Sequence, residues 1–320
     1  RFNDHLIREK LRKFQVVGNI EVVNQNEIYS ISTDLSLELI HVNHSIPYTN
    51  GVHLVTRDSS ILFMSDFKIE SHGLNEAPLS LKKIRSLGTS KKWRVAMLDS
   101  TSILTKRRKF NEKEIYENFE KLIGTVNKKI FITTFASNVH RIVSIIKICC
   151  KFNRKILIKS PSMHRFIDVA IKHHLIDQKI IEKIMLKEGS RMPKNAVIFL
   201  SGSQGERKSS LRNLLYNKKS FVQINPGDVF CFSSKIIPGN EKNVFNIYDE
   251  ITKKGGIILN DKDGFHSSGH ADQNDLSAVY DNYKPNYAIP VHGTTYFLDK
   301  HKVFIEKEFP TINAINIHNF

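Results

Sequence analysis

Short apolar runs alternate along the chain with stretches whose apolar residues recur at helical spacing. Apolar runs of roughly four to eight residues bounded by turn residues are typical of strands, and apolar positions at i, i+3, i+4 and i+7 are typical of helices. Their alternation favours α/β layers. The strand candidates with polar endings are Ser60–Met64, Val95–Leu98, Ile130–Thr134, Ala196–Leu200 and Tyr287–Ile289.

Each of these runs stops at Asp, His, Ser or Gly. Asp66 and Asp99 follow the first two runs, the turn Ser201–Glu206 follows the fourth, and His292 follows the last. In α/β folds, ligands bind beyond the carboxyl ends of the strands. The repeated polar endings therefore predict one site assembled from strand tips.

A short helix is expected near the end of the chain, between two histidines. Asp272 is suited to be its N-cap, and Asp275 favours the positive end of the helix dipole. One buried stripe is expected from Leu276, Val279, Tyr280 and Tyr283. Pro285 ends the helix. His270 thus lies just before a helix and His292 at the tip of the next strand, a separation compatible with closeness in space.

Length and composition fit a soluble globular protein with more than one compact unit: 320 residues, 40% hydrophobic and 25% charged. No apolar run is long enough to span a bilayer, and the first residues lack the apolar core of a signal peptide. The net charge of +16 favours a polyanionic partner such as nucleic acid. The alternative is a Lys-rich solvated surface, because no single dense basic block stands out.

The three cysteines are Cys149, Cys150 and Cys231. The adjacent pair ends an apolar run, so we expect it to fill the core rather than to form a redox pair. An odd count without metal-ligand spacing favours a reducing compartment, hence the cytoplasm.

Two glycine-containing turns could hold phosphate, but each is a weak signal by itself. SGHA (Ser268–Ala271) precedes a helix start, where an anion could bind, yet an ordinary capping turn has the same pattern. SGSQGE (Ser201–Glu206) could hold phosphate through backbone N–H groups. It is not a P-loop, because the Gly-Lys-Ser/Thr ending is absent.

Several motifs in a fixed order are more specific than any one of them. They are HVNHSIP (His41–Pro47), MSDFK (Met64–Lys68), LDST (Leu98–Thr101), TFASNVHR (Thr134–Arg141), SGSQGE (Ser201–Glu206), PGNEK (Pro238–Lys242), HSSGHA (His266–Ala271) and PVHG (Pro290–Gly293). Over nearly the whole chain they closely resemble the ribonuclease J family, of the beta-CASP branch of the metallo-beta-lactamase fold. The resemblance implies an incomplete metallo-beta-lactamase αββα sandwich over residues 1–102, an inserted beta-CASP α/β domain over 103–262, and a return segment over 263–320.

The resemblance also implies an enzyme that cuts RNA with two zinc ions, whose bound hydroxide attacks the phosphodiester. His44 and His292 resemble ligands of one zinc each, and Asp66 resembles the carboxylate shared by both. Asp99 and His270 resemble the acid–base pair. In that pair the carboxylate would orient the imidazole and raise its pKa, so that it donates a proton to the departing 3′ oxygen.

The family's phosphate-binding wall is matched by Ser201, Ser203, Gln204, Gly205, His266, Ser268 and Gly269, and further RNA contacts by Asn138 and His140. The implied partner is single-stranded RNA with a 5′-monophosphate end. The implied protein is a homo-oligomer, a dimer or tetramer, without a membrane partner, acting as endonuclease and 5′-to-3′ exonuclease in RNA processing and decay. We interpret six other histidines as surface or packing residues: His5, His41, His53, His164, His173 and His174. Of these, His53 is expected in a satisfied core or sheet position.

The chain departs from the family pattern at its start, where the His-x-His-x-Asp-His run that supplies both metals is absent, and only 28 residues follow His292. We expect a sequence truncated at both ends. With Asp66 shared, each metal would keep two protein ligands, whereas a catalytic zinc has about three. Tyr48, Ser65 and Thr294 also differ from the family's usual residues but are not metal ligands. Two alternatives stay open: an RNA-binding remnant with impaired catalysis, or a lactamase-fold hydrolase of a small substrate.

Overall fold

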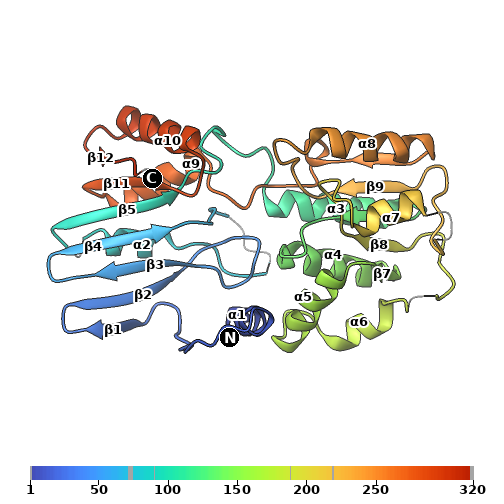
Figure 1. Cartoon of the computed structure of the whole chain (residues 1–320), viewed down its shortest axis with the longest axis horizontal. Helices are drawn as coiled ribbons and strands as arrows, with labels where there is room; N and C mark the ends of the chain where they lie inside the picture. Colours follow the sequence, from blue (N-terminus) through green and yellow to red (C-terminus); the bar gives the residue numbers. More distant parts are fainter. Residues whose placement is uncertain (1, 71–74, 90, 188, 218–219, 318–320) are drawn as a thin grey trace. The chain divides into compact units, whose positions relative to one another are not determined.

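The computed structural model describes residues 2–70, 75–89, 91–187, 189–217 and 220–317 (Figure 1). The chain divides into two compact units, unit 1 with residues 3–108 and 268–320, and unit 2 with residues 109–267. Unit 1 is thus made from two separate parts of the chain. The domain boundaries expected from the resemblance stay a prediction.

Unit 1 is built on a seven-stranded sheet with the order β1-β2-β3-β4-β5-β11-β12. Its strands are β1 (Ile28–Ser32), β2 (Leu35–His41), β3 (Asn50–Val55), β4 (Ser59–Met64), β5 (Trp93–Asp99), β11 (Tyr287–Val291) and β12 (Asn313–Ala314). Neighbours from β1 to β4 are antiparallel, whereas β4, β5, β11 and β12 are parallel. The carboxyl ends of β4, β5 and β11 therefore lie at the same edge of the sheet.

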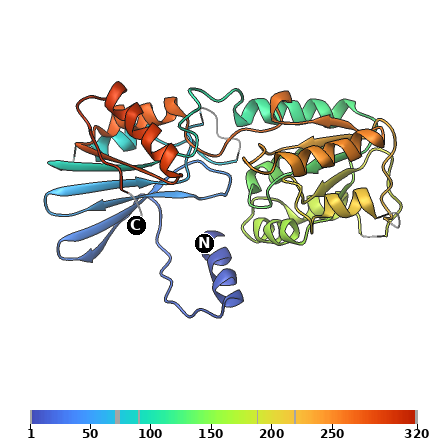
Figure 2. The same cartoon turned by 45° about the horizontal axis from the view of Figure 1, so that its top comes forward.

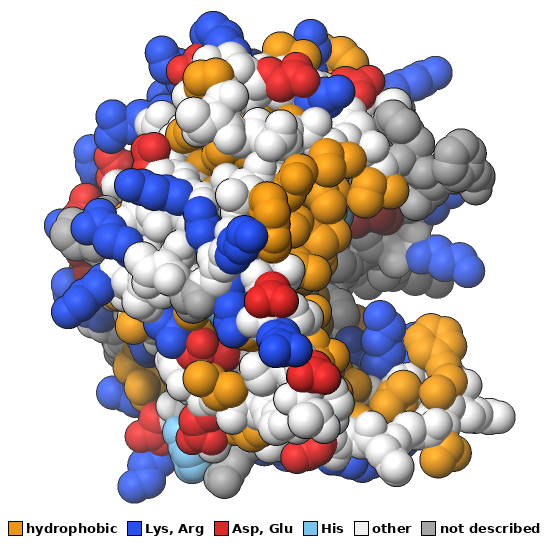
Figure 3. All heavy atoms as spheres, turned by 90° about the vertical axis from the view of Figure 1, so that its left-hand side faces the viewer, with side chains coloured by type: hydrophobic (Ala, Val, Ile, Leu, Met, Phe, Trp, Pro, Cys, Tyr) orange, Lys and Arg blue, Asp and Glu red, His pale blue; other side chains and the backbone are white. Residues whose placement is uncertain are grey.

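Helices cover one face of this sheet. These helices are α2 (Leu81–Leu87), α9 (Gln273–Tyr283) and α10 (Thr295–Glu308) (Figures 1 and 2). A further helix, α1 (Phe2–Lys13), precedes the sheet in sequence. Leu62 of β4 and Tyr280 of α9 belong to the buried core between the helices and the sheet. Side chains alternate between faces along a strand, and Phe63, the neighbour of Leu62, is exposed, as is Trp93 of β5. Figure 3 shows hydrophobic side chains gathered in a patch on this end of the molecule, with Lys and Arg dispersed over the rest of the view.

Unit 2 contains a five-stranded parallel sheet with the order β10-β9-β6-β8-β7. Its strands are β6 (Ile130–Thr133), β7 (Ile156–Ile158), β8 (Val197–Leu200), β9 (Val229–Phe232) and β10 (Ile257–Leu259). Its helices are α3 (Glu112–Thr125), α4 (Val139–Lys151), α5 (Pro161–Lys172), α6 (Gln178–Ile184), α7 (Ser210–Tyr216), α8 (Glu241–Lys253) and the 3-10 turn η1 (Asp261–Asp263). Every residue of β6, β8 and β9 is buried, as expected of a parallel sheet that is covered on both faces.

The elements expected from the residue pattern are largely confirmed. The five expected strands correspond to β4, β5, β6, β8 and β11. The last of them continues to Val291 instead of ending at Ile289, because its pairing with β5 extends through Pro290 to Asp99. The expected helix is α9, where the side chains of Asp272 and Asp275 each accept a hydrogen bond from the backbone N–H of the other. All four residues of its predicted stripe are buried.

Two expectations about single residues had mixed outcomes. Cys149 is buried and Cys150 partly exposed, and both are free thiols, as is Cys231. His53 lies buried in β3 as expected, but its Nε2 has no hydrogen-bond partner, so the expected satisfied position was wrong in this respect. Burial lowers the pKa of His53 to about 4, which keeps the ring neutral at neutral pH. Within the described residues, no helix has the length and apolar character needed to cross a membrane.

Candidate metal and acid–base site

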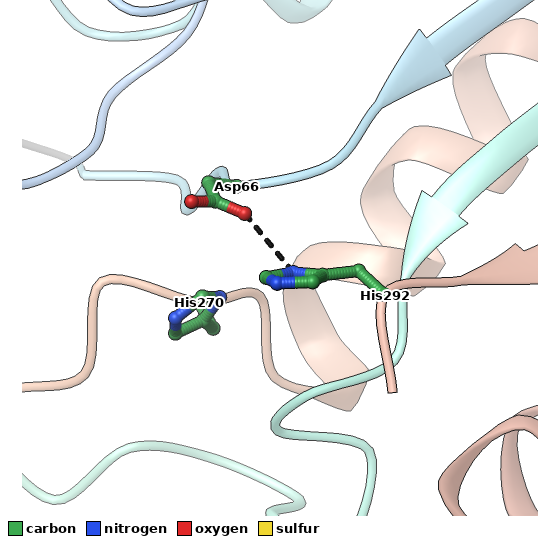
Figure 4. A group of neighbouring side chains, drawn as sticks. All are labelled: Asp66, His270 and His292. Carbon is green, nitrogen blue, oxygen red and sulfur yellow. Dashed lines mark ion pairs between the residues drawn. The ribbon is translucent and has the colours of Figure 1, made fainter. Parts of the chain in front are cut away.

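Three strand tips of unit 1 bring polar side chains together. Asp66 follows β4, Asp99 ends β5 and His292 follows β11. Because these strands are parallel neighbours in register, their tips converge at one edge of the sheet. Figure 4 shows Asp66 and His292 pointing toward one another, with His270 beside them from the turn before α9. Ligand atoms of Asp66, His270 and His292 all lie within 4.8 Å of one another.

Asp66 lies between two imidazole rings, one at each carboxylate oxygen. Its Oδ1 is 3.0 Å from His292 Nδ1, and its Oδ2 is 3.6 Å from His44 Nε2. His292 adopts a left-handed backbone conformation, with φ of 56°, that costs about 1–2 kcal/mol in a residue with a Cβ atom. The Thr101 hydroxyl donates to the carbonyl oxygen of His292 at 3.1 Å and helps to hold this turn.

The orientation of His44 is fixed by a backbone carbonyl. Its Nδ1 lies 2.8 Å from the Gly269 carbonyl oxygen, and since a carbonyl only accepts, Nδ1 carries the proton. The lone pair of Nε2 is then directed toward Asp66. A Cβ atom at position 269 would lie 2.8 Å from Cε1 of His44, so the close approach requires glycine here. Burial lowers the pKa of His44, against the opposing effects of the Gly269 carbonyl and the Asp66 charge, and favours the neutral ring that binds metals.

These donors fit a metal ion. A neutral imidazole nitrogen facing a carboxylate oxygen gains little unless a cation lies between them. A carbonyl that fixes the other ring nitrogen is the usual support of a histidine ligand. Imidazole and carboxylate are donor types of catalytic zinc sites. If Asp66 is shared by two ions, His44 and His292 supply one further donor to each.

His270 is held by Asp99, which is fully buried at the end of β5. The distance from His270 Nδ1 to Asp99 Oδ2 is 2.7 Å, and the other oxygen of Asp99 accepts from the Thr101 N–H at 2.9 Å. Burial alone would lower the pKa of His270, but the hydrogen bond to Asp99 and the charges of Asp99 and Asp66 raise it above its ordinary value. The Ser268 hydroxyl accepts from the His270 N–H at 3.1 Å. His270 therefore carries a proton more readily than a free imidazole and presents Nε2 to a ligand.

Comparison with known proteins follows the same division of the chain. Residues 127–251 match the family described as ribonuclease J, beta-CASP domain, and residues 262–317 match the Zn-dependent metallo-hydrolase RNA specificity domain. The ribonuclease J of Thermus thermophilus is 29% identical over 90% of this chain and 51% of its own length. That of Helicobacter pylori strain B128 is 29% identical over 94% of this chain and 43% of its own length. The chain therefore carries a match to the ribonuclease J beta-CASP domain and is similar to ribonuclease J over 90% or more of its length.

The chain spans about half the length of these curated relatives. A crystal structure of a protein of unknown function from Enterococcus faecalis V583 has a TM-score of 0.64 and covers 94% of this chain and 66% of its own. At 15% identity it shows the fold alone. The α/β fold is that of the metallo-beta-lactamase family with its beta-CASP domain. This ribonuclease J-like chain is thus related to hydrolytic nucleases that use metal.

The turn Ser201–Glu206 of the ribonuclease J pattern is held by its backbone conformation and by bonds to a neighbouring loop. Gly202 and Gly205 have φ of 118° and 73°, which residues with a side chain rarely adopt. The buried Gln204 accepts from the Ile237 N–H with Oε1 at 2.9 Å and donates through Nε2 to the Lys235 carbonyl oxygen at 2.9 Å. Gln204 therefore braces the neighbouring loop, and the backbone of the turn is the part left to meet a ligand.

The other expected RNA contacts have diverse surroundings. Ser203 is buried, and the Ser201 hydroxyl lies 3.2 Å from that of Ser210. Asn138 caps α4 by accepting from the Arg141 N–H. Ser268 contacts both Ser102 and the His270 N–H, in the turn before α9. His140 and His266 are half-buried, as are Ser201 and Ser268.

A buried charge network beside the site was not predicted from the sequence. Arg108 is in ion-pair contact with Asp275 and Asp272 at the start of α9, and its Nη1 is 4.0 Å from Glu70 Oε1. Lys68 Nζ lies 2.7 Å from the same Glu70 oxygen. The network joins the segment after Asp66 to the helix after His270. In the sequence, only the density of charges in MSDFKIE and at the helix start indicates such a network. Neither segment shows which charged residue pairs with which.

A second missed group lies behind Asp99. His301 of α10 is fully buried, with Nδ1 2.9 Å from the Ser100 hydroxyl and Nε2 3.0 Å from the Tyr280 hydroxyl. Burial lowers the pKa of His301 to about 3, so the ring is neutral and both nitrogens are satisfied. We interpret it as a structural support for the tip of β5.

Proposed function

We propose that this chain is part of a zinc-dependent ribonuclease that hydrolyses phosphodiester bonds of single-stranded RNA. The observation that carries the proposal is the Asp99–His270 pair, 2.7 Å apart, placed beside a carboxylate that faces two imidazoles. A proton donor next to a metal-type donor set is what hydrolysis of a phosphodiester requires.

His44, Asp66 and His292 would hold the metal, with Asp66 shared between two zinc ions. When bound, zinc supplies a hydroxide at neutral pH and neutralises charge on the phosphate. Gly269 orients His44 through its carbonyl oxygen, and Thr101 holds the turn of His292. The chain thereby keeps the ligand atoms in place before metal or RNA binds.

His270 would donate a proton from Nε2 to the departing 3′ oxygen of the cleaved RNA strand. Asp99 holds Nδ1 and favours the protonated ring, so that the acid is available at neutral pH. Asp99 is fully buried, and this keeps its carboxylate in one orientation. Ser268 fixes the backbone of the same turn.

The finer features of the proposal come from the family. The RNA backbone and its 5′-monophosphate end would contact Ser201, Ser203, Gln204, Gly205, His266, Ser268, Gly269, Asn138 and His140, with Gln204 acting through the loop that it braces. We propose both endonuclease and 5′-to-3′ exonuclease action in RNA processing and decay, by a dimer or tetramer. Free cysteines fit a reducing compartment such as the cytoplasm.

The test is cleavage of a 5′-phosphorylated, single-stranded RNA by the full-length protein loaded with zinc. His270→Ala is expected to lower the rate by two to four orders of magnitude, about the contribution of a general acid, while RNA binding persists. Asp66→Ala is expected to abolish cleavage and reduce bound zinc. His174→Asn, an exposed control in a left-handed turn that Asn tolerates, is expected to leave both unchanged. RNA binding without zinc or cleavage in the unaltered protein would instead establish an RNA-binding remnant.

A further inference from the structure

A basic groove over α7 lies outside the acid–base site. Its volume is about 680 Å³. The residues that line it all lie between positions 207 and 217, and they are Arg207, Lys208, Arg212, Asn213, Tyr216 and Asn217, together with two serines. Among the described residues that line it, none is acidic. This α7 groove therefore presents three cationic side chains and two amides to whatever enters it.

The helix that carries the groove is packed against the core of unit 2. Leu211, Leu214 and Leu215 of α7 are buried in the core of unit 2, so the opposite side of the helix is held in place. The Ser210 hydroxyl accepts from the Ser201 N–H at 2.8 Å and ties the helix start to the Ser201–Glu206 turn. The turn and the start of α7 are therefore joined, and the side chains of the groove project from a backbone that is fixed in place.

The groove also contains an aromatic ring. Tyr216 is 49% exposed, and the guanidinium of Arg212 lies 5.3 Å from the centroid of its ring. Planar guanidinium and phenol groups are surfaces on which bases stack, and they do so with little preference for sequence. Cationic side chains around such a platform match the alternating phosphates and bases of a single strand.

We propose that the α7 groove binds a segment of single-stranded RNA, with Arg207, Lys208 and Arg212 on phosphates and Tyr216 beneath a base. The inference rests on the proposed function, because it takes RNA as the substrate. It adds a second contact surface, distinct from the turn and the acid–base residues.

The first test removes the charge. In the full-length protein, the triple variant Arg207→Ala, Lys208→Ala, Arg212→Ala is compared with the wild type in binding a fluorescent RNA of about 20 nucleotides at several salt concentrations. Single strands lose roughly 0.7 in the slope of log K against log salt per phosphate contact, so three contacts predict a slope smaller by about 2. The matched control removes three exposed lysines of the same unit, Lys172, Lys179 and Lys183.

The second test isolates the ring. Tyr216→Ala is expected to weaken binding of the same RNA on the order of tenfold, as for a lost stacking contact, whereas Tyr216→Phe keeps it.

The outcomes separate this inference from the proposed function. If the unaltered protein binds and cleaves RNA but the groove triple variant behaves like the lysine control, general surface charge accounts for binding and the groove proposal is wrong. Equal loss with Tyr216→Ala and Tyr216→Phe would likewise overturn stacking on the ring. If His270→Ala leaves cleavage intact, the proposed function fails while the binding result for the groove still stands.

Discussion

Replacing Arg108 by glutamine offers a sharp test of how unit 1 holds its site. The Arg108 side chain is 13% exposed, and it faces Asp272 and Asp275, which are 4% and 9% exposed. Glu70 keeps its contact with Lys68 when Arg108 is removed. The two aspartates of α9 would lose their described cationic partner inside the protein.

The expected cost follows from this burial. Removing one partner of a buried ion pair costs about 3–5 kcal/mol, because an uncompensated charge stays behind. We expect Arg108→Gln to lower the free energy of unfolding of unit 1 by about that amount. Adding Asp275→Asn removes part of the orphaned charge and should recover about half of the loss. Arg107→Gln, an exposed neighbour of the same residue type, should cost at most about 0.5 kcal/mol.

The assay is urea unfolding followed by tryptophan fluorescence. Trp93 is the one tryptophan of the sequence and lies on β5, so its signal reports on unit 1. The midpoint should fall with an unchanged dependence on urea concentration. A loss below about 1 kcal/mol, or no recovery in the double variant, would show that the network is not a buried, mutually compensated cluster.

Three further predictions concern substitutions of single residues. Gly269→Ala places a Cβ atom 2.8 Å from His44 and should weaken zinc binding about 10- to 100-fold by chelator competition, whereas Gly18→Ala, with nothing within 4 Å, should leave it unchanged. Asp99→Asn removes the charge that raises the pKa of His270, the proposed proton donor. Its alkaline limb of cleavage rate against pH should shift to lower pH; an unmoved limb would rule out this role. His53 has a pKa of about 4 in the folded state, so between pH 6.5 and 4 the unfolded chain alone takes up its proton and stability falls as pH falls. His53→Leu should remove this loss, seen as a smaller drop in unfolding free energy between pH 7.5 and 5, and equal drops would contradict it.

Local sequence signals predicted the elements well. The start of α9 was predictable because its cap and stripe are formed by residues only a few positions apart. The strands of unit 2 were predictable because runs that are buried on both faces are continuously apolar. The boundary of β11 was missed, because the partner strand decided where it ends.

The candidate site was predictable only in part. Strand endings indicated that Asp66, Asp99 and His292 meet, but their roles came from the family resemblance. The hydrogen bonds of Gln204 to a neighbouring loop and the unpaired nitrogen of His53 depend on residues that are distant in sequence. Nothing in the residue pattern specifies which charge pairs with which across such distances.

The division of unit 1 into two chain segments constrains the order in which the protein folds. The Arg94 N–H donates to Asn286 across 192 positions, next to the pairing of β5 with β11. Closing so long a loop costs conformational entropy, and the cost is smaller once unit 2, a continuous stretch, has already compacted. On the ribosome, Asp66 and Asp99 emerge long before His270 and His292. Asp66 and Asp99 can therefore meet His270 and His292 only after both segments of unit 1 have emerged, so a shorter nascent chain carries no assembled site.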